Sequence, residues 1–273
     1  MKEKIPTYEV IVIGGGISGM YLTYRLRELG MHFRVFEAGA DVGGTWYWCR
    51  YPGARFDSES WSYGYFFDEE LLQEWEWKEH FSPQPDTLEY LNFVAKKFDL
   101  RRDMTFNARV TVAEFDDDDN HWTVTFEDGS QARATLLITG LGVLSEPTLP
   151  NIPGRDEFKG LAFHTARWPH EPISFAGKRV GVIGTGATAI QAIPEIAKTA
   201  GHLSVFQRHP NWAAPLNNSK ITSEEQKDIK SRYDEIYARC WETVGCFIHT
   251  PDPRSALDIT PEEREEFWEK LHS

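Results

Sequence analysis

The hydrophobic pattern is clearest near the start of the chain, where Tyr8–Ile13 is an apolar, β-branched run typical of a parallel strand buried on both faces. A helical pattern over Tyr21–Leu29 follows and ends at Gly30. The next apolar run, H-F-R-V-F-E, is a second predicted strand that closes with Glu37. The order strand, turn, helix, strand predicts an α/β fold with a parallel sheet.

The turn between the first strand and the helix is G-G-G-I-S-G, Gly14–Gly19. In such a loop Gly14 allows the tight turn, Gly16 lets the backbone approach a pyrophosphate, and Gly19 lets the helix pack closely on the strand. A carboxylate at Glu37 is placed to accept a ribose hydroxyl, which favours the unphosphorylated ribose of FAD or NAD. The predicted dinucleotide site comprises Gly14, Gly16, Ser18, Gly19 and Glu37.

The same pattern recurs later in the chain. Arg179–Ile183 is a predicted strand, and small residues follow it at Gly184, Gly186 and Ala189. A predicted helix then runs through Ile190 to about Lys198. The sequence therefore contains a second candidate phosphate-binding loop.

The strand after this second helix ends in Gln207 and Arg208, where the first unit has an acid. A guanidinium there can pair with a 2′-phosphate, which favours NADP(H) over NAD(H); a solvated surface arginine is the alternative. The predicted NADP site comprises Gly184, Thr185, Gly186, Ala187, Thr188 and Arg208. Two such sites imply that NADPH delivers hydride to a flavin held by the first loop.

These patterns predict two Rossmann-like dinucleotide-binding domains, one for FAD and one for NADP, with the start of a helical insertion. We expect an FAD domain over 1–145, a linker over 146–170 and an NADP domain over 171–273, whose incomplete insertion begins at about 217.

An aromatic segment lies between the first loop and the rest of the first domain: G-G-T-W-Y-W-C-R-Y-P-G-A-R-F-D, which ends at Asp57. It lacks helical or strand periodicity. Its aromatic residues are compatible with a core, but Arg50, Arg55 and Asp57 would then be buried charges that need partners. We therefore predict an ordered loop against a flat ligand. The additional flavin-site candidates are Gly44, Thr45, Trp46, Asp57, Tyr63 and Val110.

Other patterns predict helices, strands and turns to which we assign no functional role. A helix is expected from Asp86, with Glu89 closing a capping box. The acidic run at 116–119 is expected in a solvated turn, and E-D-G at 127–129 in a hairpin turn. The predicted strands are Arg109–Phe115, His121–Phe126, Gln131–Ile138 and a returning Leu136–Gly140.

Capping boxes begin two more predicted helices, at Thr222 with Glu225 and at Thr260 with Glu263. Pro261 fits the first position of the second of these helices. In the first, we expect one apolar stripe formed by Ile229, Tyr233, Ile236, Tyr237, Cys240, Trp241 and Val244.

Composition narrows the function. The net charge of −13 over 273 residues comes without a basic stripe, which argues against nucleic acid as a partner. No charged-then-apolar leader and no apolar run of roughly 20 residues is present, so we expect a cytoplasmic protein that does not enter a membrane. Cys49, Cys240 and Cys246 are too few and scattered for a disulfide framework, and no metal-binding spacing occurs.

The segment between the two loops carries the most specific motif, F-x-G-x-x-x-H-x-x-x-W-P, at Phe158–Pro169. It resembles the signature of the Baeyer–Villiger monooxygenases, and the aromatic segment ending at Asp57 resembles that family's second signature. The resemblance covers Tyr8 to about Pro215. Related flavin monooxygenases that oxidise amines and sulfides share both glycine loops, but the Trp-Pro pair favours the Baeyer–Villiger branch.

The resemblance implies an FAD- and NADPH-dependent enzyme that uses O2, through a C4a-peroxyflavin, to convert a hydrophobic cyclic or aliphatic ketone into a lactone or ester. It implies that Asp57 pairs with a charge-stabilising Arg and tunes the site. His164 is implied to couple domain motion to cofactor placement. The catalytic candidates are Asp57, His164, Trp168 and Arg55.

The chain also departs from the family. Family members are much longer, and their charge-stabilising Arg lies in a return segment that this sequence lacks, so a C-terminally truncated chain is expected. Cys49 stands where Asn is usual, and His209 stands where a small hydroxyl residue is common. The alternatives are a catalytically silent or split nucleotide-binding fragment that needs a complementary C-terminal chain, or a related enzyme that oxidises N or S centres.

Overall fold

The computed structural model of the chain describes residues 5–250, 253–255 and 257–272. The chain forms two compact units. The first contains the residues up to Asp57 together with Phe81–Ser219, and the second contains Ser58–His80 together with the residues from Lys220 onward. The polypeptide therefore leaves the first unit after Asp57 and returns to it at Phe81. The division into FAD, linker and NADP segments stays a prediction.

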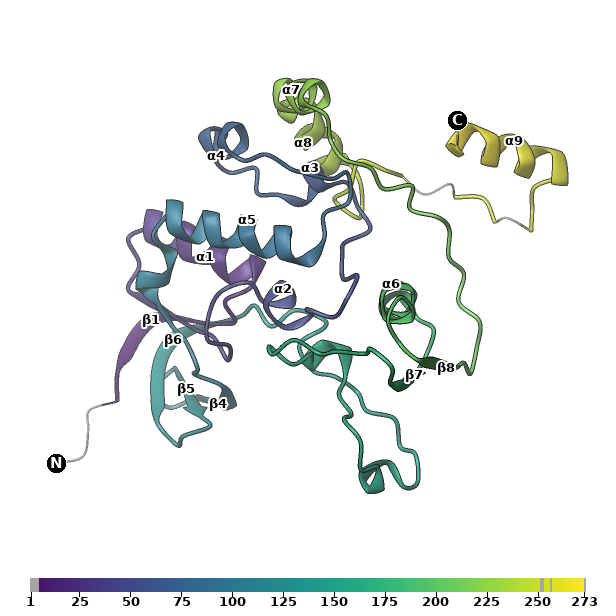
Figure 1. The fold of residues 1–273 in the computed structure, drawn as a ribbon. Helices are drawn as coiled ribbons and strands as arrows, with labels where there is room; N and C mark the ends of the chain where they lie inside the picture. Colours follow the sequence, from purple (N-terminus) through teal and green to yellow (C-terminus); the bar gives the residue numbers. More distant parts are fainter. Residues whose placement is uncertain (1–4, 251–252, 256, 273) are drawn as a thin grey trace. The chain divides into compact units, whose positions relative to one another are not determined.

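Among the described residues, a six-stranded sheet in the order β3-β2-β1-β6-β5-β4 forms the centre of the first unit. Figure 1 labels β1, β6, β5 and β4 of this sheet. β1 lies between β2 and β6 and pairs with both in parallel. Its residues Val10, Ile11 and Val12 are fully buried, as expected for a strand covered on both faces. The predicted α/β fold with a parallel-dominated sheet is confirmed. The strands are β1 (Thr7–Ile13), β2 (Phe33–Phe36), β3 (Met104–Thr105), β4 (Val110–Asp116), β5 (His121–Phe126) and β6 (Gln131–Thr139).

β6 joins the parallel part of this sheet to its antiparallel part. The sequence suggested two overlapping strands here, but Gln131–Thr139 is one strand that pairs in parallel with β1 and antiparallel with β5. The hairpin turn between β5 and β6 is confirmed, with Gly129 in the left-handed region at φ 83°. The acidic residues 116–119 are exposed at the β4–β5 turn, as predicted.

Helices α1 (Ile17–Glu28) and α5 (Gln84–Lys97) lie side by side in the first unit (Figure 1), and Tyr24 of α1 makes a ring contact with Phe98 at the end of α5. α1 begins four residues before the predicted Tyr21, directly from the glycine loop. The predicted capping box at Asp86 is wrong, because Pro83 occupies the N-cap position of α5. Pro85 lies in the first turn of α5, where its missing N–H is not needed. Asp86 therefore lies inside this turn and not at the N-cap. The 3₁₀ turn η1 (Leu100–Asp103) follows α5.

The second nucleotide motif forms β7 (Arg179–Ile183), α6 (Ala187–Ala197) and β8 (His202–Phe206), with the two strands parallel. α6 begins directly after the glycines and runs through Ile190, as predicted. Two 3₁₀ turns, η2 (Arg155–Glu157) and η3 (Thr165–Arg167), lie in the linker that precedes β7.

The second unit contains α3 (Ser60–Tyr63), α4 (Glu69–Glu74), α7 (Ser223–Ser231), α8 (Tyr233–Glu242) and α9 (Pro261–His272). Both predicted capping boxes are confirmed, at Thr222 with Glu225 and at Thr260 with Glu263.

The prediction of one long helix after Thr222 is wrong, because the helix is interrupted at Arg232 and forms two helices, α7 and α8. Only part of its expected apolar stripe is core: Ile229, Tyr233, Ile236 and Cys240 are buried. The exposed members of the stripe are Tyr237, Trp241 and Val244. Among the residues that the structure describes, no helix is both long and apolar enough to cross a membrane.

Candidate active site

The first glycine loop joins β1 to α1 in a turn that excludes side chains at two positions. Gly14 has φ 105°, and a Cβ built there would lie 2.6 Å from the carbonyl oxygen of Gly140. A Cβ on Gly19 would lie 1.8 Å from the carbonyl oxygen of Gly14. The start of α1 therefore rests directly on the turn, as a phosphate-binding loop requires.

Glu37 lies at the end of β2 and is only 5% exposed. Its Oε2 accepts a hydrogen bond of 2.5 Å from the backbone N–H of Gly15, and its Oε1 accepts one of 2.6 Å from Gly39. The carboxylate is thus fixed at the edge of the glycine loop. Because an ionised carboxylate offers about four acceptor sites, capacity remains for the ribose hydroxyl that the sequence predicts there.

The aromatic segment contains a short helix, α2 (Thr45–Trp48), which corrects the expectation of a loop without regular structure. Gly44 begins it with φ 52°, and a Cβ on Gly44 would lie 2.8 Å from the Cα of Gly16. The two predicted flavin-site segments therefore lie against each other. Trp46 is buried against Phe56, with ring centroids 5.6 Å apart, so its side chain belongs to the core.

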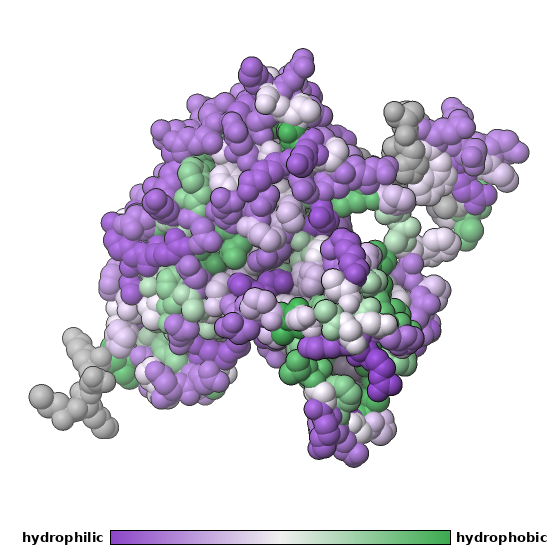
Figure 2. Space-filling model, viewed as in Figure 1, coloured by the Kyte–Doolittle hydropathy of each residue, from purple (hydrophilic) through white to green (hydrophobic). Residues whose placement is uncertain are grey.

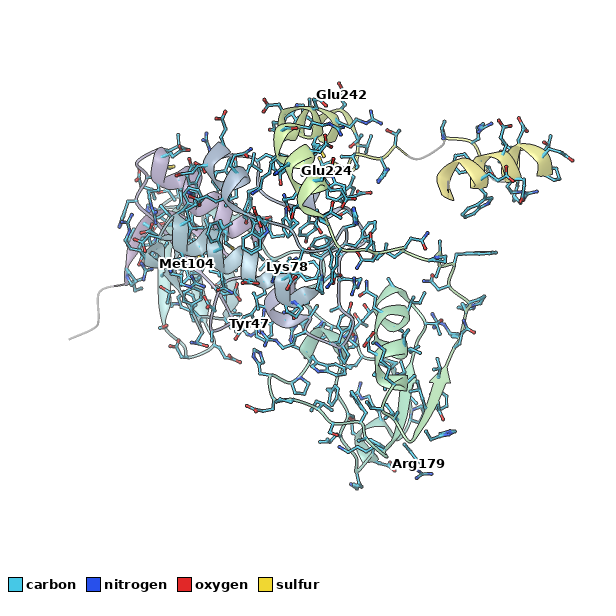
Figure 3. All side chains as sticks on the ribbon, turned by 45° about the horizontal axis from the view of Figure 1, so that its top comes forward. Tyr47, Lys78, Met104, Arg179, Glu224 and Glu242 are labelled. Carbon is cyan, nitrogen blue, oxygen red and sulfur yellow. The ribbon has the colours of Figure 1, made fainter. Side chains whose placement is uncertain are left out.

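The linker motif packs on this same segment. The guanidinium of Arg167 lies over the Trp48 ring at 5.0 Å, and His170 contacts the Tyr47 ring at 5.3 Å. Figure 3 labels Tyr47 in this part of the unit. Burial, followed by the charge of Arg50, lowers the pKa of His170. The structure thus brings the two signature segments together.

The two motif residues singled out from the sequence have local roles in this packing. His164 caps η3, and its Nδ1 accepts a hydrogen bond of 3.1 Å from the backbone N–H of Ala166. When the ring is neutral, its proton therefore resides on Nε2. Trp168 makes an edge contact with Phe163 at 4.7 Å.

Arg55 and Asp57 lie where the aromatic segment meets α6. Nη1 of Arg55 donates a hydrogen bond of 3.1 Å to the carbonyl oxygen of Phe81. Oδ1 of Asp57 accepts one of 3.2 Å from Nε2 of Gln191. Sequence reasoning missed Gln191, because a single glutamine inside a helix carries no motif; only its proximity in space identifies it.

The second glycine loop is the more open of the two. Gly184 has φ 103°, and Gly186 forms the N-cap of α6, which has no side-chain cap. A Cβ on Gly186 would meet nothing within 4 Å, so it would enter open space at the helix N-terminus. Arg208 is exposed just after β8, on the side where the hydroxyl of Thr185 donates to the carbonyl oxygen of His209 at 3.2 Å.

Two candidates lie apart from these loops in the sequence. Val110 begins β4 and pairs with Phe126. Tyr63 ends α3 in the second unit, whereas the other predicted site residues belong to the first. The roles of all these residues stay predictions. The residues of both glycine loops fit a dinucleotide, because each loop leaves a helix N-terminus without a side-chain cap and small residues around it.

Comparison with known proteins agrees with this geometry. A sequence profile of the pyridine nucleotide-disulphide oxidoreductase family matches residues 11–248. The chain belongs to this family. It is 46% identical over 94% of its length to an acetone monooxygenase (methyl acetate-forming) of Gordonia sp. and covers 48% of that protein. It is 40% identical over 96% of its length to a Baeyer–Villiger monooxygenase of Pseudooceanicola batsensis, again covering 48% of the relative.

Other relatives widen the range of chemistry. A phenazine N-monooxygenase of Lysobacter antibioticus is 38% identical over 96% of this chain, which covers 48% of it. A crystal structure of OTEMO in complex with FAD and NADP superposes with a TM-score of 0.91 and 44% identity, over 98% of this chain and 52% of that one. The chain spans about half the length of the curated relatives it matches. The resemblance to Baeyer–Villiger monooxygenases is confirmed.

Proposed function

We propose that the protein is an FAD- and NADPH-dependent Baeyer–Villiger monooxygenase that converts a hydrophobic cyclic or aliphatic ketone into a lactone or ester with O2. The observation that carries the proposal is the packing of the two signature segments on each other, between two glycine loops shaped for phosphate. The relatives named for acetone and Baeyer–Villiger oxidation support the same chemistry.

When bound, reduced FAD supplies the activation of O2, and NADPH supplies the hydride that reduces the flavin. In our proposal the N-terminus of α1, with Gly14, Gly16, Ser18 and Gly19, holds the FAD pyrophosphate. Glu37 accepts the FAD ribose hydroxyl. The remaining FAD contacts within the first unit are assigned to Gly44, Thr45, Trp46, Asp57 and Val110.

The second loop holds the other dinucleotide. We assign its pyrophosphate to the N-terminus of α6, and its 2′-phosphate to the exposed guanidinium of Arg208. Backbone N–H groups and the helix dipole favour anions at such a terminus. The assigned residues are Gly184, Thr185, Gly186, Ala187, Thr188 and Arg208.

Asp57 is assigned the electrostatic role near the reacting groups. Its carboxylate is exposed and is held by Gln191, which leaves acceptor capacity for a cationic side chain. Fixed charges and dipoles of this kind act most strongly where water is excluded. Arg55 lies in the same segment and shares the assignment, whereas His164 and Trp168 are assigned to positioning the linker.

We further propose that full activity requires polypeptide beyond the matched half, supplied in the same chain or as a complementary C-terminal chain. The half-length coverage of the relatives supports this. Small ketones and O2 are the proposed reactants. The three cysteines are free thiols, which supports a reducing, cytoplasmic location.

A second candidate function is oxidation of a nitrogen or sulfur centre. The similarity to a phenazine N-monooxygenase favours it specifically. A catalytically silent nucleotide-binding protein is the third alternative, and it predicts bound cofactors without turnover.

The test supplies the purified protein with FAD, NADPH and ¹⁸O₂, and offers cyclohexanone, a thioether and a tertiary amine in separate reactions. We expect lactone that carries one ¹⁸O by mass spectrometry when polypeptide corresponding to the C-terminal half of the relatives is present. An N- or S-oxide without lactone would replace the proposal by the second candidate. Cofactor binding without any product, also after addition of a C-terminal half from the acetone monooxygenase relative, would leave only the silent alternative.

A further inference from the structure

The side chain of Gln191 in α6 holds the segment that ends at Asp57. Its Oε1 accepts hydrogen bonds from the hydroxyl of Tyr51 at 2.8 Å and from the backbone N–H of Arg55 at 3.3 Å. Its Nε2 donates to the carbonyl oxygen of Arg55 at 2.9 Å and to Oδ1 of Asp57 at 3.2 Å. The amide thus uses both of its hydrogens and both acceptor positions on one short segment.

The bonds to Arg55 and Asp57 fix the orientation of this amide. The N–H of Arg55 donates, whereas the carbonyl oxygen of Arg55 and the carboxylate of Asp57 accept, and each faces the matching atom of Gln191. Reversing the amide would place its oxygen against the carboxylate of Asp57 and its NH₂ against the N–H of Arg55, which would lose or oppose the three bonds to Arg55 and Asp57, although the Tyr51 hydroxyl could still accept. The segment and the helix are therefore joined in one specific register.

The same segment also contacts the first turn of α6. The side chain of Thr188, one helical turn before Gln191, lies beside the hydroxyl of Tyr51. Burial raises the pKa of Tyr51, and the neighbouring Thr188 side chain opposes that rise. Gly53 has φ 80°, and a Cβ there would lie 2.4 Å from the carbonyl oxygen of Gln191. The backbone of the segment thus lies directly on the helix.

We propose that Gln191 and Tyr51 form a latch through which a dinucleotide bound at the N-terminus of α6 sets the position of Asp57. The latch rests on the proposed function for the identity of that ligand. Thr188 belongs both to the predicted phosphate loop and to the Tyr51 contact, so a phosphate that orders the first turn of α6 also orders the segment. Gln191 is a positioning residue, which acts through Asp57.

The latch makes the coupling reciprocal. If the bound dinucleotide favours the latched segment, then breaking the latch must weaken dinucleotide binding by the same factor, because coupling between two sites is symmetric in equilibrium. Typical coupling factors are about 5- to 150-fold. We expect Gln191→Leu to raise the Kd for NADP⁺ at the lower end of that range.

Hydrogen–deuterium exchange of a peptide covering residues 51–57 tests the latch in the FAD-loaded protein, because the Arg55 N–H donates directly to Gln191. In the unchanged protein, NADP⁺ should slow exchange of this peptide. In Gln191→Leu the peptide should exchange faster, and NADP⁺, still bound by calorimetry, should no longer slow it. Lys198→Ala, an exposed change on the same helix region, is the matched control and should preserve the effect.

A second measurement distinguishes loss of the latch from simple unfolding of the Gln191→Leu variant. Tyr51→Phe removes the hydroxyl from the other side of the latch, so it and Gln191→Leu should be non-additive in their effect on NADP⁺ affinity. Additive effects, or NADP⁺-dependent protection that persists in Gln191→Leu, would overturn the latch while leaving the proposed function intact. Failure of the unchanged protein to bind NADP⁺ would overturn the assigned ligand, and with it the coupling.

Discussion

The two carboxylates nearest the proposed cofactors are held in different ways. Glu37 is buried and accepts hydrogen bonds from the backbone N–H groups of Gly15 in the glycine loop and of Gly39 just after β2. Asp57 is exposed and is bonded to the side chain of Gln191. The position of Glu37 is therefore fixed by the backbone, whereas the position of Asp57 depends on another side chain.

This difference gives a prediction for Asp57→Ala. The variant should keep FAD, because the proposed ring and phosphate contacts lie mostly elsewhere, but ester formation should slow by roughly ten- to hundredfold. That is the scale of losing one hydrogen bond to a charged group, about 1.5–3 kcal/mol. Flavin absorbance after gel filtration measures retention, and ester yield measures rate. A normal ester yield would remove Asp57 from the catalytic residues.

Arg208→Ala should weaken the binding of NADPH much more than the binding of NADH. The guanidinium is exposed, so its removal should leave the fold unchanged. Binding of NADPH should weaken by about 1–3 kcal/mol, the scale of a lost charge-assisted hydrogen bond, while NADH binding barely changes. Dissociation constants from fluorescence titration decide the matter, and equal losses for both cofactors would contradict the assignment of the 2′-phosphate.

The limit of sequence reasoning at this scale is visible in Gln191. The glycines carry a spacing that has one physical meaning, and the structure gives Gly14 and Gly184 the left-handed backbone that such loops need. Gln191 has no such pattern, and it meets Asp57 only because α6 folds against a distant segment. Contacts between residues far apart in sequence leave no periodicity to detect.

At the scale of elements, the two glycine loops differ in how much space surrounds them, which gives a matched pair of variants. Gly19→Ala would place a Cβ 1.8 Å from the carbonyl oxygen of Gly14, and should destabilise the protein by about 1–3 kcal/mol or more. Gly186→Ala meets nothing within 4 Å and should melt as the unchanged protein does, but it should bind NADP⁺ more weakly because its methyl group enters the proposed phosphate space. Thermal melts with and without NADP⁺ test both, and a stable Gly19→Ala would contradict the packing.

The capping box of α7 gives a pH-dependent prediction. The backbone N–H of Thr222 is the main cause that lowers the pKa of Glu225 below its ordinary 4.5. A lowered folded pKa means that the carboxylate adds stability above the unfolded pKa and loses it as pH falls through the folded value. Glu225→Gln should therefore melt lower than the unchanged protein at neutral pH, and the difference should shrink as the pH falls below 4.5 and the carboxylate becomes protonated. The neighbouring Glu224→Gln should show a smaller difference in circular-dichroism melts, and an equal one would refute the capping role.

Element boundaries were the least predictable part of the fold, for identifiable reasons. Most strands followed from alternation and apolar runs, but the two-residue β3 carries no such pattern, and β6 is one strand where two overlapping strands were expected. The start of α5 was also missed, because the Asp86–Glu89 spacing imitates a capping box while Pro83 and Pro85 already favour an earlier start. The break at Arg232 also had no signal in an apolar stripe that continues across it.

At the scale of the whole molecule, apolar side chains gather on the surface of the first unit around the linker and β7–β8, where Figure 2 shows green residues. Val143 is 99% exposed and Leu161 is 74% exposed, and further large apolar residues surround them in the sequence. The most exposed of these are Leu141, Leu144, Leu149, Phe158, Ile183, Phe206 and Trp212. Contiguous exposed apolar surface is typical of a contact that another polypeptide covers.

The 273-residue polypeptide should consequently self-associate when purified alone. Changing Val143 and Leu161 together to Ser should reduce both association and binding of a hydrophobic dye, without lowering the melting temperature, because neither side chain is buried. Sedimentation velocity and dye fluorescence provide the measurements. A double variant that associates as strongly as the unchanged chain would show that this surface is not responsible.

The central position of β1 also affects the order in which the sheet forms during synthesis. One neighbour of β1, β2, follows it closely in the chain, but the other, β6, is synthesised only after α5, β4 and β5. A nascent chain at the ribosome can therefore flank β1 on one side early, while its second edge stays unpaired until most of the first unit has emerged. Such long-range pairing is slow to form, so the glycine loop at the end of β1 reaches its final shape late in folding.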